Sequence, residues 1–264
     1  MLRCRCSVKT ESIYVEKKAY TSKYTDERLV EINEKNRRSR VGALREHSEW
    51  IETLRTELPK FIPFLRDTCG LSFRGRILEI GAGDAWLSAE ISKLPGVVEI
   101  IATDVSPRRL KEDAPRVFRL LGARADKITR MPADFHHLDF RDSYFDFVVC
   151  SAVLQDAANI VQVLREVKRV LKPGGRFVAI REPVWPLMKL KSRTRLVEAL
   201  VTTGVNERYY SLAHYKEFFK QAAMPIEVKR VTLSSGLKYF FDQVFNGLTH
   251  ARYAFIGVKR SRST

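Results

Sequence analysis

Apolar residues between positions 76 and 181 occur in blocks with two different periods. Short, nearly continuous apolar runs are typical of strands that are buried on both faces of a parallel sheet. Longer stretches with an apolar residue every three or four positions are typical of amphipathic helices. Strands that alternate with helices in this way predict a parallel sheet with helices on both faces. The predicted elements are strand 76–80, helix 85–94, strand 97–103, helix 107–121, strands 127–133 and 145–150, helix 157–171 and strand 176–181.

The residues before this block have a different pattern. Residues 1–25 are polar and aperiodic, so we expect a flexible, basic N-terminus whose first dozen residues are disordered. Residues 26–74 have apolar positions at helical spacing, which predicts an N-terminal helical cap. Pro59 and Pro63 are expected to break this helical run into pieces, because proline removes a backbone donor and clashes with the preceding turn.

The residues after Glu182 are predicted to complete the same domain. Segment 183–204 mixes apolar and basic residues, and we expect it to form a lid. Apolar residues from Leu237 to Leu248 recur at helical spacing, which predicts an amphipathic helix that covers the sheet. A substrate wall or a membrane-facing surface is the alternative for this helix. The remaining predicted elements are helix 211–222 and strands near 226–233 and 251–259.

These patterns together predict the fold class. We expect an α/β, three-layer sandwich around a mostly parallel, seven-stranded Rossmann-like sheet whose last strand is antiparallel, with added N-terminal helices and a lid. The predicted division of the chain is an N-terminus over 1–25, a helical cap over 26–74, a cofactor-binding core over 75–182 and a lid with sheet-completing elements over 183–264.

Length and composition are consistent with one α/β domain. The chain has 264 residues, of which 45% are hydrophobic. Its four cysteines, Cys4, Cys6, Cys69 and Cys150, match neither a disulfide framework nor a metal-ligand pattern, so we expect a reduced, cytoplasmic protein without a metal site. A signal-peptide core and a run of about 18 apolar residues are both missing from the sequence, which argues against a standard secretion signal and a membrane span.

The formal net charge of +16 lies mostly outside the predicted core. Residues 75–182 carry 17 basic and 15 acidic side chains, whereas residues 183–264 carry 14 basic and 5 acidic ones. A positively charged lid favours an anionic substrate, a phospholipid surface or nucleic acid. A solvated basic face is the alternative interpretation.

The first strand of the core leads into a glycine turn. The apolar run 77–80, which contains Glu79, is followed by Gly81-Ala82-Gly83 and then by a helix. Such a turn lets the backbone approach a ligand closely at a helix N-terminus. Dinucleotide-binding turns carry a third glycine three residues later, where this chain has Trp86. A nucleotide-like ligand that carries an amine and no phosphate therefore fits better.

The second strand of the core ends in a carboxylate. Asp104 lies 21 residues after Gly83, and a carboxylate at this strand end can accept hydrogen bonds from both hydroxyls of a ribose. Capping of the following helix is the alternative role for Asp104. Glu79 could likewise serve packing, by accepting a backbone N–H bond.

These residues resemble the class I S-adenosylmethionine-dependent methyltransferases, of the small-molecule type. That family's motif, acid-x-Gly-x-Gly-x-Gly, is matched by Glu79, Gly81 and Gly83, with Ala85 in place of the last glycine. We expect right-handed helical geometry at Ala85, which tolerates its methyl group. Three further segments, 133–135, 140–149 and 166–176, resemble later motifs of the family in the expected order, so the resemblance covers roughly residues 75–182.

The resemblance implies S-adenosyl-L-methionine as the cofactor. It implies that the glycine turn holds the methionine part, that Asp104 holds the ribose, that Asp134 accepts from the adenine amino group and that Phe135 lines the ring. The implied cofactor-binding residues are Glu79, Gly81, Ala82, Gly83, Asp104, Val105, Asp134, Phe135 and Ser151.

Candidate catalytic residues are less clearly indicated. Related enzymes often carry a histidine after the fourth strand, where this chain reads Ser151-Ala152-Val153-Leu154-Gln155-Asp156. Asp156 is therefore the first candidate for a general base, and Glu182 and His214 are the others. Tyr24 and Trp86 are candidates for a cation-π contact with the sulfonium. Asp146, at a strand start, is expected to be structural.

Three functions remain open from the sequence. The first is a methyltransferase that acts on a small molecule, a glycan or a lipid headgroup. The basic lid is compatible with an anionic group on this substrate and with contact between the protein and a membrane surface. The second is an RNA methyltransferase, suggested by the basic C-terminal third. Against it, the loop after the fourth strand lacks the Asn/Asp-Pro-Pro-aromatic pattern. The third is a protein that binds the cofactor without turnover.

Overall fold

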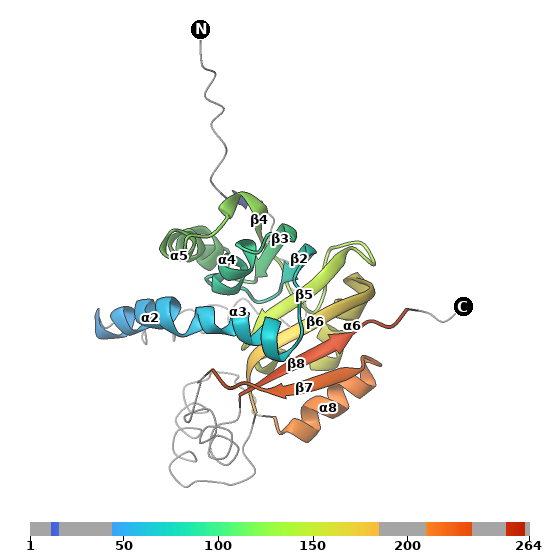
Figure 1. Ribbon diagram of the computed structural model, residues 1–264. Helices are drawn as coiled ribbons and strands as arrows, with labels where there is room; N and C mark the ends of the chain where they lie inside the picture. Colours follow the sequence, from blue (N-terminus) through green and yellow to red (C-terminus); the bar gives the residue numbers. More distant parts are fainter. Residues whose placement is uncertain (1–11, 16–43, 185–209, 234–251, 262–264) are drawn as a thin grey trace.

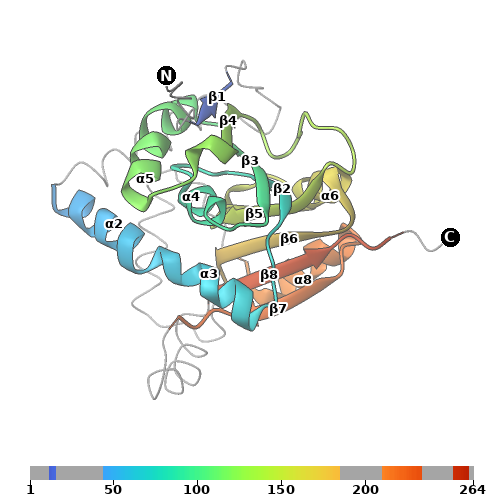
Figure 2. The ribbon, with the colours of Figure 1, turned by 45° about the horizontal axis from the view of Figure 1, so that its top comes forward.

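An eight-stranded mixed sheet lies between two layers of helices in the computed structural model (Figures 1 and 2). The structure describes residues 12–15, 44–184, 210–233 and 252–261. The strands follow the order β1-β4-β3-β2-β5-β6-β8-β7 across the sheet. Their bounds are β1 Ile13–Tyr14, β2 Gly75–Glu79, β3 Val97–Asp104, β4 Ile128–Pro132, β5 Phe145–Ser151, β6 Leu171–Pro183, β7 Ile226–Arg230 and β8 Arg252–Val258.

The helices largely agree with the predicted ones. Predicted helix 107–121 contains a π-helical segment, η3, before α5. The bounds are α2 Leu44–Thr56, η1 Leu58–Lys60, α3 Phe61–Pro63, η2 Phe64–Thr68, α4 Trp86–Ser92, η3 Arg109–Asp113, α5 Ala114–Leu121, η4 Ala125–Lys127, η5 Leu154–Asp156, α6 Ile160–Val170 and α8 Leu212–Gln221. Most of the predicted lid, the predicted helix Leu237–Leu248 and Tyr24 lie outside the described residues.

The sheet confirms the predicted α/β class and corrects the strand count. Each strand runs parallel to its neighbours except β8, which is antiparallel to both β6 and β7. The strand missing from the prediction is the edge strand β1, whose Ile13 pairs with Thr129 of β4. The Arg130 side chain donates to the carbonyl oxygen of Ser12 at 3.2 Å, which helps to hold β1 in place. Two residues are too few to show a hydrophobic period, so the sequence pattern could not reveal this strand.

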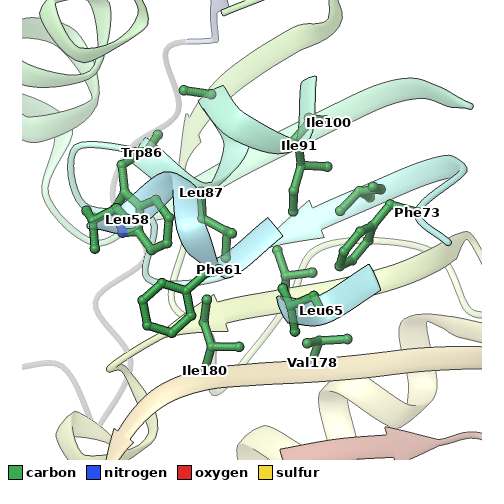
Figure 3. Close-up of a cluster of buried hydrophobic side chains, with 14 of the residues drawn as sticks. Leu58, Phe61, Leu65, Phe73, Trp86, Leu87, Ile91, Ile100, Val178 and Ile180 are labelled. Atoms are coloured by element: carbon green, nitrogen blue, oxygen red, sulfur yellow. The ribbon is translucent and has the colours of Figure 1, made fainter. Parts of the chain in front are cut away.

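Each face of the sheet has its own hydrophobic core. The first core lies between the sheet and the helices α2 to α5, and the second lies between the sheet and helices α6 and α8 (Figure 2). Figure 3 shows part of the first core, where Phe61 and Leu65 approach Val178 and Ile180 of β6. Burial of large apolar side chains contributes about 1.5–3 kcal/mol each, so these contacts fix the N-terminal helices on the sheet.

The N-terminal cap is divided into short helical pieces around its two prolines. Pro59 lies in the 3₁₀ turn η1 and Pro63 ends α3, and the chain continues without interruption into the π-helical turn η2. Proline is tolerated in the first turn of a helical segment because its missing N–H has no partner there. The prediction that the prolines break this run into pieces is confirmed, and each proline coincides with a change of helix type.

Strand β6 contains an irregularity close to its carboxyl end. Its pairing with β8 shifts register between Ala179 and Glu182, whose partners are Phe255 and Tyr253. Three steps along β6 thus oppose two steps along β8, which is the signature of a β-bulge. Arg181 lies inside this bulge with a φ of 60°.

Candidate functional site

The glycine turn joins β2 to α4 at the carboxyl edge of the parallel strands. Gly81 and Gly83 both have a φ of 60°, a conformation that glycine adopts without steric cost. A Cβ atom at Gly81 would lie 2.7 Å from the methyl groups of Val153, so the loop after β5 packs directly on the turn. The backbone N–H of Ala82 donates to the carbonyl oxygen of Thr103 at 2.8 Å, which ties the turn to β3.

Asp104 lies beside this turn, at the end of β3. Its Oδ2 accepts from the backbone N–H of Gly83 at 2.7 Å, and its Oδ1 accepts from the backbone N–H of Ser106 at 2.9 Å. The following helix is capped by Ser106, whose Oγ accepts from the Arg109 N–H at 3.3 Å. Asp104 is thereby held at the edge of the sheet, next to the turn, as the sequence predicted. Val105 follows it and is partly exposed.

Arg109 is a residue of this region that the sequence analysis did not identify. Its Nη1 lies 3.8 Å from Oδ2 of Asp104, and a Cβ atom at Gly83 would overlap its guanidinium group. The guanidinium therefore covers the glycine turn from the side of η3. A cation at the start of a helix is opposed by the helix dipole, so the contact with Asp104 is what favours this position.

Glu79 is buried and faces helix α4. Its Oε2 accepts from the backbone N–H of Ser88 at 2.9 Å and from the Ser88 hydroxyl. Burial raises the pKa of Glu79 to about 8. This geometry matches the packing role that the sequence left open, in which Glu79 joins the end of β2 to the helix that begins after the turn.

Ala85 departs from the geometry expected for it. It precedes α4 with a φ of 56° and a ψ of 35°, which is left-handed rather than right-handed helical geometry. A side chain in this region costs roughly 1–2 kcal/mol relative to glycine. The expectation of right-handed geometry was wrong, because the backbone of the turn forces this position into the conformation for which a glycine would be suited.

Helix α2 contacts the glycine turn from outside. The indole N–H of Trp50 donates to Oδ2 of Asp84 at 3.1 Å. Trp86, the first residue of α4, is buried against Phe61, with 6.1 Å between the ring centroids (Figure 3). The cation that lies over the Trp86 ring is the Arg181 guanidinium, at 5.9 Å from the ring centroid. The predicted contact of Trp86 with a sulfonium stays a prediction.

Asp134 belongs to a buried hydrogen-bonded group. Its Oδ1 accepts from the backbone N–H of His136 at 2.8 Å and lies 2.8 Å from Nδ1 of the same residue. The backbone N–H of Asn159 donates to Nε2 of His136 at 3.3 Å, which requires a hydrogen on Nδ1 in the neutral ring. This group fixes the chain beside half-buried Phe135, so the structure brings both predicted adenine-contacting residues to the same edge as Asp104.

The loop after β5 is held by Glu182. This fully buried carboxylate accepts from the backbone N–H groups of Val153 and Leu154, each at 3.1 Å. Burial raises the pKa of Glu182 to about 8. Ser151 ends β5 next to this loop, and the Nη1 of Arg181 donates to its Oγ at 3.4 Å. Glu182 thus positions the loop that packs on the glycine turn.

The three candidate bases have different surroundings. Glu182 is occupied by the two backbone donors described above. Asp156 is exposed in η5. His214 is exposed in the first turn of α8, where its Nδ1 accepts from the backbone N–H of Ser211 at 3.2 Å in a capping box. The assignment of a general base therefore stays a prediction.

Asp146 has the structural role that the sequence predicted. Its Oδ2 accepts from the backbone N–H of Arg76 at 2.8 Å, and it forms an ion pair with Lys172 at 2.8 Å. These contacts lower its pKa against the opposing effect of burial. Among the described residues, no three His, Cys, Asp or Glu side chains gather as a metal site would require. The helices in the same ranges include none that is long and apolar enough to cross a membrane.

Comparisons with known proteins agree with this geometry. Residues 78–179 match the family described as "Methyltransferase domain". The ubiquinone/menaquinone biosynthesis C-methyltransferase UbiE of Pseudomonas putida (strain GB-1) is 33% identical over 131 residues, which cover 49% of this chain and 50% of that protein. UbiE of Proteus mirabilis is 30% identical over 130 residues, which cover 47% and 50%. The chain thus spans about half the length of the curated relatives it matches.

Solved structures share the fold at low sequence identity. The YcgJ protein from Bacillus subtilis has a TM-score of 0.55 and 19% identity, over 77% of this chain and 98% of that one. Phosphoethanolamine N-methyltransferase 2 of Haemonchus contortus, solved with S-adenosyl-L-methionine, has a TM-score of 0.59 and 16% identity, over 77% and 53%. Residues 78–179 thus match a methyltransferase-domain family, and the strand order, with β8 antiparallel to both of its neighbours, gives the described part of the chain the Rossmann-like fold of solved methyltransferase structures.

Proposed function

We propose that this protein transfers a methyl group from S-adenosyl-L-methionine to a small-molecule acceptor. The observation that carries the proposal is the placement of the Asp104 carboxylate at 2.7 Å from the backbone nitrogen of Gly83, at the carboxyl edge where open α/β sheets bind ligands. A turn with two glycines and a carboxylate beside it provide close backbone approach and a hydroxyl acceptor in one place.

The residues present fit this cofactor. A Cβ atom at Gly81 or Gly83 would collide with Val153 or Arg109, so the close packing of these two side chains on the turn requires glycine at both positions. In the proposed arrangement, the turn holds the methionine part and Asp104 accepts from the ribose hydroxyls. Asp134 and Phe135 are the proposed adenine contacts.

The chemistry requires alignment more than it requires a covalent step. When bound, the cofactor supplies a methyl group on a positively charged sulfur, which a nucleophile displaces in line. The protein's proposed part is to hold the loop after β5 in a fixed position through Glu182, and to exclude water through the close packing of Val153 on Gly81. Holding both reactants in one geometry can supply much of the rate increase without a dedicated base.

In the described part of the chain, the location of positive charge favours a small acceptor over RNA. A hollow of about 910 Å³ is lined by cationic side chains from α6, α8 and the segment after β8, including Arg165, Lys216 and Arg260. It lies at the C-terminal ends of α6 and α8, which is the amino edge of the parallel strands. The proposed cleft lies at the opposite edge. Some of these cations also donate to carbonyl oxygens at helix ends, as Lys168 does to Ala223 at 2.8 Å. Part of the positive charge in this hollow therefore serves to cap helices.

The similarity to UbiE proteins supports a small-molecule acceptor, and the basic residues of the predicted lid, Lys189, Lys191, Arg193 and Arg195, are our reason to include an acceptor with an anionic group. A lipid headgroup or glycan of this charge belongs to the same proposal. We place the reaction at the surface of the carboxyl edge, beside Ser151 and Arg181, whose side chains flank the glycine turn.

Calorimetric titration of the purified protein with S-adenosyl-L-methionine and with S-adenosylhomocysteine tests the proposal. We expect saturable binding of both, and we expect radiolabelled methyl transfer into a small-molecule fraction of a cell extract. Incorporation into RNA alone would favour the second function. Binding without incorporation into any fraction would favour a non-catalytic protein, and absence of binding would contradict the proposal.

A further inference from the structure

We propose that Arg181 is an anion-binding residue of the cleft, and that its guanidinium group takes a carboxylate or phosphate group of a bound ligand. The proposal rests on the proposed function, because it assigns a ligand group to that cleft. It adds a recognition residue that neither the family motifs nor the sequence pattern identify.

The bulge in β6 directs Arg181 to the face of the sheet that carries Trp86, at the carboxyl edge. Along β6, Ala179 packs in the second core and Ile180 in the first. Strict alternation would continue with Arg181 on the second core and Glu182 on the first. The register shift reverses this order, so Arg181 lies over Trp86 of the first core and Glu182 lies within the second. Bulges beside active sites serve to re-aim a side chain in this way.

Backbone strain gathers at the same edge. In the described part of the chain, five residues other than glycine have a positive φ. Three of them, Ala85, Ala152 and Arg181, follow or end β2, β5 and β6 at the carboxyl edge. Such conformations cost about 1–3 kcal/mol each and are concentrated at ligand-binding sites. Arg181 therefore keeps its place at a cost in stability, which is expected of a residue retained for recognition.

Among the described residues, Trp86 and Ser151 contact the Arg181 side chain and orient it. Its guanidinium carbon lies 5.9 Å from the centroid of the Trp86 ring, and its Nη1 lies 3.4 Å from Oγ of Ser151. Trp86 begins the helix after the glycine turn, and Ser151 ends the strand beside it. The guanidinium thus lies between the two elements that frame the methyl-transfer end of the proposed cleft. A planar guanidinium positioned in this way matches the geometry of a carboxylate or phosphate.

An anionic group could reach Arg181 from two ligands. One source is the α-carboxylate of the cofactor's own methionine part, and the other is an anionic group of the acceptor. The chemistry is the same in both cases, so binding measurements with ligands that carry or lack the carboxylate distinguish them.

The experiment compares wild-type protein with Arg181→Gln and Arg181→Gly by calorimetry. Glycine adopts a φ of 60° without strain, so Arg181→Gly removes the guanidinium without adding a folding penalty at this position. Arg176→Gln, five residues earlier in the same strand, is the matched control. The ligands are S-adenosylhomocysteine, 5′-methylthioadenosine, which lacks the amino-acid part, and benzoate or inorganic phosphate added to protein saturated with S-adenosylhomocysteine.

A loss of at least tenfold in affinity for S-adenosylhomocysteine, with 5′-methylthioadenosine unchanged, assigns Arg181 to the cofactor carboxylate. Unchanged S-adenosylhomocysteine binding, with loss of benzoate or phosphate binding to the loaded protein, assigns it to the acceptor. The proposal is overturned if both variants bind all probes within twofold of wild type, or if both nucleosides weaken equally. Failure of wild-type protein to bind S-adenosylhomocysteine would instead contradict the proposed function.

Discussion

The backbone N–H of Gly83 donates to Oδ2 of Asp104 across 2.7 Å, so the glycine turn and the end of β3 are fixed to each other before any ligand binds. The carboxylate is 7% exposed, and its second oxygen accepts from Ser106 at 2.9 Å. A ribose would meet an acceptor whose direction is already set. Such preorganisation reduces the cost of ordering on binding.

Asp104→Asn should weaken cofactor binding because its amide group would oppose the Gly83 N–H with a donor. We expect S-adenosylhomocysteine affinity to fall at least tenfold, which corresponds to about 1.4 kcal/mol, and stability to fall by about 1–2 kcal/mol. Calorimetry and urea unfolding measure the two effects. Asp126→Asn, which removes a surface partner of Arg124, is the control and should change neither. Unchanged affinity in Asp104→Asn would contradict the assignment of Asp104 to the ribose.

Arg109→Met should favour the substrate form of the cofactor over the product form. The Arg109 guanidinium lies on the glycine turn. Because S-adenosyl-L-methionine carries one more positive charge than S-adenosylhomocysteine, a positive charge beside the proposed site repels it more strongly. At a separation of roughly 8 Å and an effective dielectric constant of about 40–80, the difference is about 0.5–1 kcal/mol. The ratio of the two dissociation constants should therefore shift two- to fivefold toward S-adenosyl-L-methionine at low salt. A ratio that stays constant would place the Arg109 charge outside the cleft.

Trp50→Phe should loosen helix α2 from the glycine turn. The change keeps an aromatic ring but removes the hydrogen bond to Asp84, which is 3.1 Å long. We expect a loss of about 1–2 kcal/mol in unfolding free energy and faster amide exchange in residues 81–84. Thr53→Ala removes a bond to the backbone of Glu49 on the exposed side of the same helix and is the matched control. Equal effects of the two variants would indicate that the Trp50 bond has no special role.

Sequence patterns located the sheet and the carboxyl edge that carries the candidate site, because these depend on local signals. The apolar runs that became β2, β3 and β5 are buried on both faces, and a glycine turn and a terminal carboxylate are visible as residue types. The same signals brought Asp104 and Asp134 to one edge, because parallel strands end together. Strand β1 escaped prediction because its two residues are held by pairing with β4 and not by a hydrophobic period.

The partners of the buried acids could not be read from local patterns. Glu182 bonds to backbone groups 28 and 29 residues away, and the orientation of Arg181 depends on a bulge against β8, which lies over 70 positions later. The left-handed geometry of Ala85 likewise depends on how the turn closes against neighbouring strands. Arg181 and Glu182 were visible in the sequence as a pair of charged residues at a strand end. The sequence does not indicate that the bulge exchanges the faces of the sheet to which their side chains point.

The two buried glutamates should make the protein less stable as pH rises. Burial raises the pKa of Glu79 and that of Glu182 to about 8, whereas an exposed glutamate in the unfolded chain titrates near 4.5. Between pH 4.5 and pH 8 the folded state binds more protons than the unfolded state, so the free energy of unfolding falls as pH rises. The contribution of these two groups to stability is therefore greatest below about pH 4.5 and levels off above about pH 8. The slope is at most about 1.4 kcal/mol per pH unit for each group.

Glu182→Gln should remove one group's share of the slope between pH 5.5 and 7.5. It should also lower stability by a constant amount, because its amide would oppose a backbone donor. Urea unfolding at several pH values, with Glu227→Gln on the surface as control, measures this. Parallel pH profiles for wild type and Glu182→Gln would mean that Glu182 stays ionised when buried, with the two backbone N–H donors outweighing its desolvation.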